Sequence, residues 1–98
     1  MATKFRKKPV EIEAMRMDGL TEDMIAVYRW VERNTQGSFD PLADEIPASG
    51  VTIDPATGFM NIASLEGLMT VKPGDWVIRG VKGEFYPCKP DIFAATYE

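Results

Sequence analysis

Apolar and acidic residues alternate along residues 10–17, VEIEAMRM, near the beginning of the chain. Val10, Ile12 and Ala14 lie on one face of this pattern, and Glu11 and Glu13 lie on the other. Neighbouring side chains of a strand point to opposite faces, so the spacing of two predicts a half-buried strand. The alternation slips at Ala14 and Met15, which indicates either a bulge or a strand that is covered on both faces.

A helical period replaces the alternation after Asp18-Gly19, where a turn is expected. Thr21 is expected to cap the helix, because its hydroxyl can accept from the unpaired amides of the first turn. The apolar positions then recur at i, i+3, i+4 and i+7, and this face consists of Met24, Val27, Tyr28 and Val31. Leu20 and Ile25 have the spacing of a hydrophobic staple. We expect the helix to end between residues 34 and 37.

Short strands are predicted for most of the second half of the chain. Residues 38–50 contain two prolines and no sustained period, which favours an irregular connection. The turn DPATG predicts a hairpin, and further turns separate five expected strands, at residues 51–54, 58–62, 68–71, 76–79 and 84–88. We expect a single helical turn at residues 92–95 and an edge strand at residues 96–98. The pattern predicts an α+β fold: a small curled antiparallel sheet or open barrel covered by one long helix.

Composition and charge favour one acidic domain spanning residues 1–98 of the chain. The net charge is -4, but residues 1–8 form a basic amino-terminal arm with four basic residues, Lys4, Arg6, Lys7 and Lys8. The remaining residues carry 7 basic and 15 acidic side chains, a balance of 7 − 15 = -8. Nucleic acid is disfavoured as a partner, because its binding depends on neutralising phosphates. The single cysteine, the absence of an apolar leader and the lack of a long apolar run favour the cytoplasm over secretion or a membrane.

The chemistry of the chain is limited by the absence of histidine and by the single Cys88. The usual general base near neutral pH and the commonest zinc ligand are therefore missing. A carboxylate or magnesium site is conceivable from Asp75, Glu84 and Asp91, although each has the position of a turn, strand or cap residue. We expect Cys88 to be unreactive, since Lys89 is its only local activator. No catalytic residue, metal ligand or cofactor is therefore assigned, and an enzyme is disfavoured.

Two sets of residues are candidates for binding. Cations lie among aromatic residues near the end of the chain, a mixture that suits a nucleotide through ring stacking and charge. The ligand-binding candidates are Trp76, Arg79, Lys82, Tyr86 and Lys89. Trp30 lies off the apolar stripe of the helix and Phe39 lies in the irregular connection, so both are candidate anchors for a partner protein.

Both ends of the chain resemble a family of small proteins of unknown function from tailed bacteriophages and prophages. The resemblance rests on the opening KFRKKPVEIEAMRM and the closing TVKPGDWVIRGVKGEFYPCKPDIFAATYE. It implies a setting, the cytoplasm of an infected bacterial host, and an accessory role, but no activity, cofactor or site residue.

Three functions follow as hypotheses. The first is a non-enzymatic binder, assembling as a homo-oligomer, that sequesters a nucleotide-derived small molecule in counter-defence. The second is a protein-protein inhibitor or modulator of a host factor. The third is a carboxylate- or magnesium-dependent enzyme acting on a phosphorylated small molecule.

Overall fold

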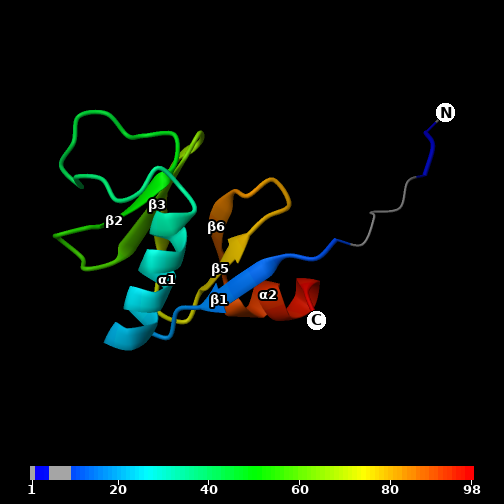
Figure 1. Ribbon diagram of the computed structural model, residues 1–98. Helices are drawn as coiled ribbons and strands as arrows, with labels where there is room; N and C mark the ends of the chain where they lie inside the picture. The colour runs from blue at the N-terminus through cyan, green and yellow to red at the C-terminus, as the bar shows by residue number, and fades with distance from the viewer. Residues whose placement is uncertain (1, 5–9) are drawn as a thin grey trace.

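The computed structural model describes residues 2–4 and 10–98 and contains two sheets of three antiparallel strands and two helices. The predicted α+β class is confirmed (Figure 1). In chain order, the elements are β1 (Glu13–Arg16), α1 (Thr21–Arg33), β2 (Gly50–Ile53), β3 (Met60–Ser64), β4 (Gly67–Val71), β5 (Trp76–Arg79), β6 (Phe85–Cys88) and α2 (Pro90–Thr96). Of the basic arm, Arg6, Lys7 and Lys8 lie outside the described residues, and Lys4 is exposed.

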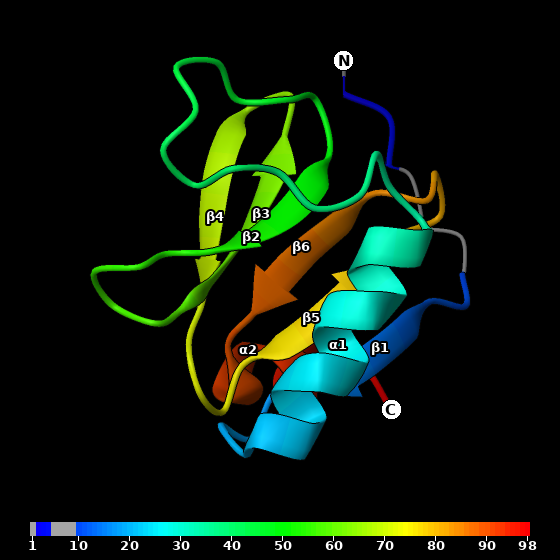
Figure 2. The same ribbon diagram turned by 60° about the vertical axis from the view of Figure 1, so that its left-hand side comes forward.

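The strands form two separate sheets, in the orders β1-β5-β6 and β2-β3-β4. Figure 2 shows α1 in front of β1 and β5, with β2–β4 forming the other side of the molecule. α1 contacts both β1 and β2, and β6 contacts β3 and β4 without pairing with either. The expected curled sheet is thus divided in two, and α1 covers the junction.

The covering helix is shorter than the single long helix that we expected, since α1 has 13 residues and α2 adds a further 7. Side chains end α1 by competing for its last carbonyl groups. The Asn34 amide donates to the Trp30 carbonyl oxygen at 2.8 Å, and the Thr35 hydroxyl donates to that of Val31 at 2.7 Å. The predicted cap is also wrong: Leu20 is the N-cap residue, Thr21 is the first helical residue, and no side chain caps this end.

Two elements near the ends of the chain differ from prediction: β1 is shorter than expected, and α2 replaces part of the expected edge strand. β1 is limited to the four residues that face β5, from Glu13 opposite Arg79 to Arg16 opposite Trp76. The expected edge strand at residues 96–98 does not form. α2 instead continues to Thr96, whose hydroxyl donates to the Ile92 carbonyl oxygen at 2.7 Å.

The hairpins follow local turn chemistry. In the predicted DPATG turn, the Asp54 carboxylate accepts from the Ala56 amide at 2.8 Å, and Gly58 supplies the required positive φ of 76°. At the start of β2, a Cβ on Gly50 would come within 2.6 Å of the Gly37 carbonyl oxygen. Glycine therefore lets the segment around Ser38 lie directly against β2, where Ser38 forms an isolated bridge to Val51.

The core lies where α1 meets the inner faces of both sheets. Val27 and Val31 of the predicted helix face are fully buried, whereas the expected staple residues Leu20 and Ile25 are exposed. The buried cluster consists of Met17, Val27, Val31, Val51, Met60, Ile62, Val71, Val77 and Phe85. Each sheet therefore buries its apolar face against the other sheet and the helix.

Ile62→Ala is expected to lower the free energy of unfolding by about 2–5 kcal/mol, because the lost side chain leaves a cavity at the centre of β3. Ile62 has no exposed surface. Urea unfolding measures the change, with Leu65→Ala as the matched control. Leu65 is 91% exposed, so its truncation is expected to change stability by less than about 0.5 kcal/mol. Equal effects of the two substitutions would contradict this description of the core.

Candidate functional site

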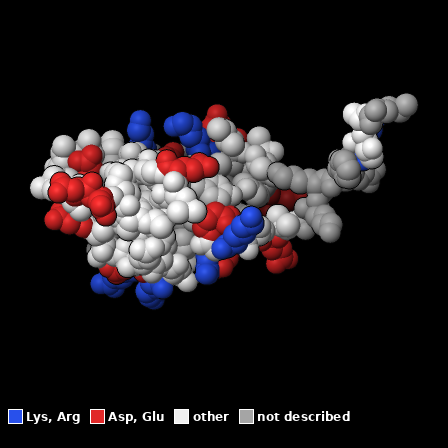
Figure 3. Space-filling view, turned by 90° about the horizontal axis from the view of Figure 1, so that it is seen from above, with Lys and Arg blue, Asp and Glu red and all other residues white. Residues whose placement is uncertain are grey.

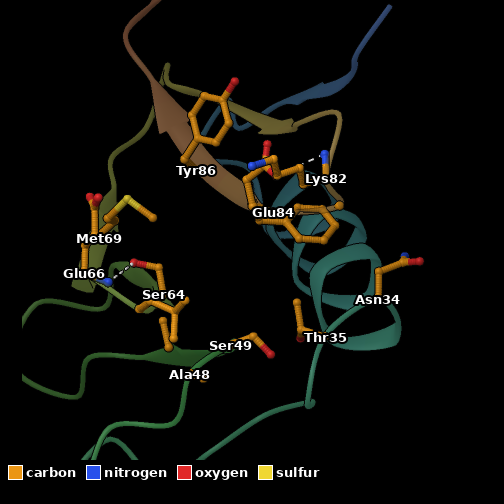
Figure 4. Close-up of a pocket in the computed structure, with 14 residues that line it drawn as sticks. Asn34, Thr35, Ala48, Ser49, Ser64, Glu66, Met69, Lys82, Glu84 and Tyr86 are labelled. Atoms are coloured by element: carbon orange, nitrogen blue, oxygen red, sulfur yellow. Dashed lines mark hydrogen bonds between the residues drawn. The ribbon is translucent and has the colours of Figure 1, made fainter.

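An open groove of about 690 Å³ lies between the two sheets, at the end where α1 finishes. Its walls come from segments far apart in the chain and are mostly apolar (Figure 4). The lining residues are Asn34 and Thr35 after α1, Ala48 and Ser49 before β2, Ala63–Glu66 and Met69 of the β3–β4 hairpin, and Lys82–Tyr86 of the β5–β6 hairpin. The volume falls within the range of small-molecule sites.

The hydroxyl groups of the groove are engaged with neighbouring backbone. Thr35 donates to the Val31 carbonyl oxygen and accepts from the Gly37 amide. Ser64 donates to the Gly67 carbonyl oxygen and accepts from the Glu66 amide. Ser49 accepts from the Gln36 amide at 3.1 Å. These side chains hold the turns around the groove in place. The hydroxyl groups of Thr35 and Ser64 already donate their only proton to backbone oxygens.

Among the residues 2–4 and 10–98 that line the groove, Lys82 is the single cation, and it lies there with Glu66 and Glu84. The Glu84 carboxylate accepts from the backbone amide of Lys82 at 3.1 Å, which fixes the turn before β6 (Figure 4). No lysine or arginine occurs between Arg33 and Lys72, a stretch that carries five acids. Figure 3 shows acidic side chains at the end of the molecule formed by the β2–β3 hairpin and the preceding loop. The charged side chains among the described lining residues are therefore two acids and one lysine.

The five residues predicted to bind a ligand are not brought together. Lys82 and Tyr86 line the groove. Trp76 instead stacks on Phe93 of α2, with ring centroids 4.1 Å apart and planes inclined by 7°. Trp76 is therefore an attachment point for α2, which has no buried residue of its own.

Arg79 and Lys89 also lie outside the groove. The Arg79 guanidinium is 3.5 Å from the Glu13 carboxylate and 5.8 Å from the centre of the Phe85 ring. Lys89 is the exposed N-cap residue of α2. Arg79 lies opposite Phe85 near the turn that carries Lys82, and Lys89 follows the other end of β6. Neither residue lines the groove with Lys82.

Tyr86 borders the groove but its hydroxyl points away from it (Figure 4). The pKa of Tyr86 is raised to about 12, first by burial and then by a side-chain hydrogen bond with Tyr97. Negative charge on Tyr97, Glu84 and Cys88 acts in the same direction. The side chain of Tyr86 therefore lines the groove with its ring and not with its hydroxyl group.

The two predicted partner anchors pack within the fold. Trp30 is partly buried against the core and meets Phe85 edge-on, with ring centroids 5.0 Å apart. The Phe39 ring lies over Gly50, 3.2 Å from the position that a Cβ would occupy there. Neither ring is among the large exposed hydrophobic side chains, which include Leu42 and Ile46 of the same connection.

The acidic candidates have local structural roles. The buried Asp75 accepts from the Lys72 amide at 3.0 Å and closes the turn before β5. Asp91 lies in the first turn of α2. Within residues 2–4 and 10–98, no group of three or more Asp, Glu, Cys or His side chains is placed to hold a metal ion.

Cys88 lies at the end of β6, where its thiol is 3.6 Å from the Lys89 carbonyl oxygen. Burial raises the pKa of this thiol, and the charges of Asp75 and Asp91 raise it further. Since the thiolate is the reactive form, these surroundings support the expectation that Cys88 is unreactive.

Sequence reasoning missed most of the groove. Ala48, Ser49, Ser64 and Met69 carry no motif, and they meet only because the β3–β4 hairpin and the end of α1 lie against the β5–β6 turn. The acidic stretch between Arg33 and Lys72 was no guide to them, because Glu66 is the one of its five acids that lines the described groove.

Comparison of the chain with protein-family models, curated proteins and solved structures found no match. Neither helix of the described chain is long and apolar enough to cross a membrane. The role of the groove is therefore argued from its geometry.

Tyr97→Phe is expected to lower the pKa of Tyr86 from about 12 towards its ordinary value of 10.0, because it removes a hydrogen bond and a neighbouring charge. A raised pKa favours the neutral phenol in the folded state. Its stabilising effect is complete below pH 10 and is lost as the pH rises towards 12. The substitution should weaken this alkaline loss.

Ultraviolet titration of the tyrosines and urea unfolding at several alkaline pH values measure both effects. Tyr28→Phe serves as the control, since Tyr28 lies on α1 away from this pair. An unchanged titration of Tyr86 in Tyr97→Phe would contradict the assigned contact.

Proposed function

We propose that the protein is a non-catalytic binding protein that holds a small amphipathic ligand in the groove between its two sheets. The observation that carries this proposal is a mostly apolar groove of about 690 Å³ with one cation, Lys82, among its lining residues. Such sites combine apolar walls, which provide affinity, with few polar groups, which orient the ligand. Leu65 and Met69 provide the apolar contact, and Lys82 provides the polar one.

The charges of the groove limit the ligand class. Lys82 can pair with one anionic group, whereas Glu66 and Glu84 repel a second. A nucleotide-derived molecule with a single phosphate therefore fits this groove better than a di- or triphosphate. Its base would lie against the apolar wall and its phosphate near Lys82.

The chemistry of the remaining candidates supports binding over catalysis. Asp75 and Glu84 accept hydrogen bonds from neighbouring backbone, and the pKa of Cys88 is raised. The resemblance to tailed-bacteriophage proteins supports a setting in the cytoplasm of an infected host. In that setting, sequestering a nucleotide-derived signal would act as counter-defence.

The first experiment is native mass spectrometry of protein purified gently from bacteria, followed by a denaturing spectrum of the same sample. A mass that is lost on denaturation identifies a retained ligand. NMR titration with nucleoside monophosphates and with inorganic phosphate then tests the groove directly. We expect amide shifts at residues 64–69 and 82–86 with the monophosphates.

Lys82→Ala is expected to weaken monophosphate binding about tenfold, since a hydrogen bond to a charged group contributes about 1.5 kcal/mol. Lys89→Ala is the matched control, because Lys89 is an exposed lysine outside the groove. Equal losses in both variants would indicate nonspecific attraction. Shifts located at Trp76 and Lys89 in place of the groove would overturn the assignment.

A second candidate function is binding of an apolar segment of a host protein. It is favoured by the hydroxyl groups of Thr35 and Ser64, which donate to backbone oxygens and leave few donors for a polar ligand. In this case the apolar walls would supply most of the affinity.

Ala48→Arg is expected to abolish binding of peptides selected from a random display library, because a large charged side chain would occupy the groove wall. Calorimetric titration of the selected peptides measures the loss. Ala56→Arg is the control, since Ala56 is exposed in the β2–β3 turn outside the groove. Peptides that bind both variants equally, or no selected peptide at all, would remove the second candidate.

A further inference from the structure

The four outer edges of the two sheets are protected to very different degrees. An open edge is a template for pairing with another chain, and proteins usually block it with charges, proline or a covering segment. The edge of β2 is covered, since the Phe39 amide donates to the Val51 carbonyl oxygen and the Val51 amide to that of Gly37. The edge strand β6 contains Pro87, which lacks a backbone donor.

The edge of β4 is protected neither by charge nor by proline, and β6 contacts β4 without pairing with it. The sequence of β4, GLMTV, is uncharged and contains no proline. β3 pairs with one side of β4, and in the described part of the chain no strand pairs with the other. In Figure 2, β4 is the outermost strand of its sheet, on the left. Its apolar Leu68 is 42% exposed.

The residues flanking β4 are complementary to those of a second, antiparallel β4. A symmetric register centred on Met69 pairs positions whose numbers add to 138. Gly67 then lies opposite Val71 of the second copy, and Leu68 opposite Thr70. Continued by one position beyond each end of β4, this register brings Glu66 of the β3–β4 turn near Lys72 of the second copy, and the two-fold axis forms this pair twice.

Glu66 and Lys72 are both exposed, and neither makes an ion pair with another residue described by the structure. The edge of β1 offers the comparison. An antiparallel pair of β1 strands would likewise place Glu13 opposite Arg16, but these charges already have partners. Arg16 pairs with Asp18 at 2.7 Å, and Glu13 pairs with Arg79.

We propose that the protein forms a two-fold symmetric dimer through β4, which joins the two β2-β3-β4 sheets into one continuous six-stranded sheet. Backbone hydrogen bonds between the β4 strands hold the dimer, and the two Glu66–Lys72 pairs set its register. The contact involves one short strand from each copy, so association is weak and depends on concentration. The proposal requires no ligand, although Glu66 and Met69 of the dimer contact also line the groove.

Charge reversal tests the dimer. Sedimentation velocity up to about 1 mM is expected to show a monomer–dimer equilibrium for the natural sequence. Glu66→Lys and Lys72→Glu each turn two attractive pairs into two repulsive ones. Each is expected to raise the dimer Kd about tenfold or more. Glu45→Lys is the control of equal charge change, because Glu45 lies on the exposed loop before β2.

Mixing the two single variants is the decisive step, because a Glu66→Lys chain and a Lys72→Glu chain form two attractive pairs with each other. Native mass spectrometry should show a heterodimer, and the double variant should recover the homodimer. Hydrogen exchange at residues 68–70 should slow as concentration rises. A protein that stays monomeric at about 1 mM, reversals that leave Kd unchanged, or a mixture that does not associate would each overturn the proposal.

Discussion

The contact between the two small sheets and α1 is the interaction on which the rest of this structure depends. A sheet of three short strands cannot bury enough apolar surface by itself to be stable. Val31 of α1, Ile62 of β3 and Phe85 of β6 belong to one buried cluster, so all three units share a single core. This sharing explains how a chain of 98 residues forms a stable unit without a disulfide.

The same contact produces the groove. β6 lies against β3 and β4 but does not pair with them, so the hairpin turns are left apart at one end of the molecule. Side chains that hold each turn, such as Ser64 and Glu84, become the walls of that space. The groove is therefore a consequence of two sheets meeting as separate layers. Residues such as Ser64 and Glu84 line it and also stabilise the turns in which they lie.

Local features of the fold were predictable where local chemistry decides them. The strand Trp76–Arg79 and the DPATG hairpin follow from alternation and turn residues that act over a few positions. The cap of α1 and the structure of residues 96–98 were not predicted correctly. Leu20 precedes α1 without a side-chain cap, and α2 continues through Thr96. At these ends the alternatives differ by single hydrogen bonds.

The candidate site shows the same division. Lys82 and Tyr86, two of the five ligand-binding candidates chosen from the mixture of cations and aromatic rings, line the groove. Trp76 and Arg79 belong to that mixture too, but Trp76 stacks on Phe93 and Arg79 pairs with Glu13. Composition alone does not reveal which rings and charges already have partners within the fold.

The sequence by itself determined the α+β class, the face of α1 that is buried, the hairpins and the acidic stretch between Arg33 and Lys72. Each of these depends on residue spacing or composition. Only the tertiary structure decided that the strands form two sheets, that a groove opens between them and that no described strand pairs with the outer edge of β4. These features depend on which strands meet across long stretches of chain, and side-chain period carries no information about such pairings.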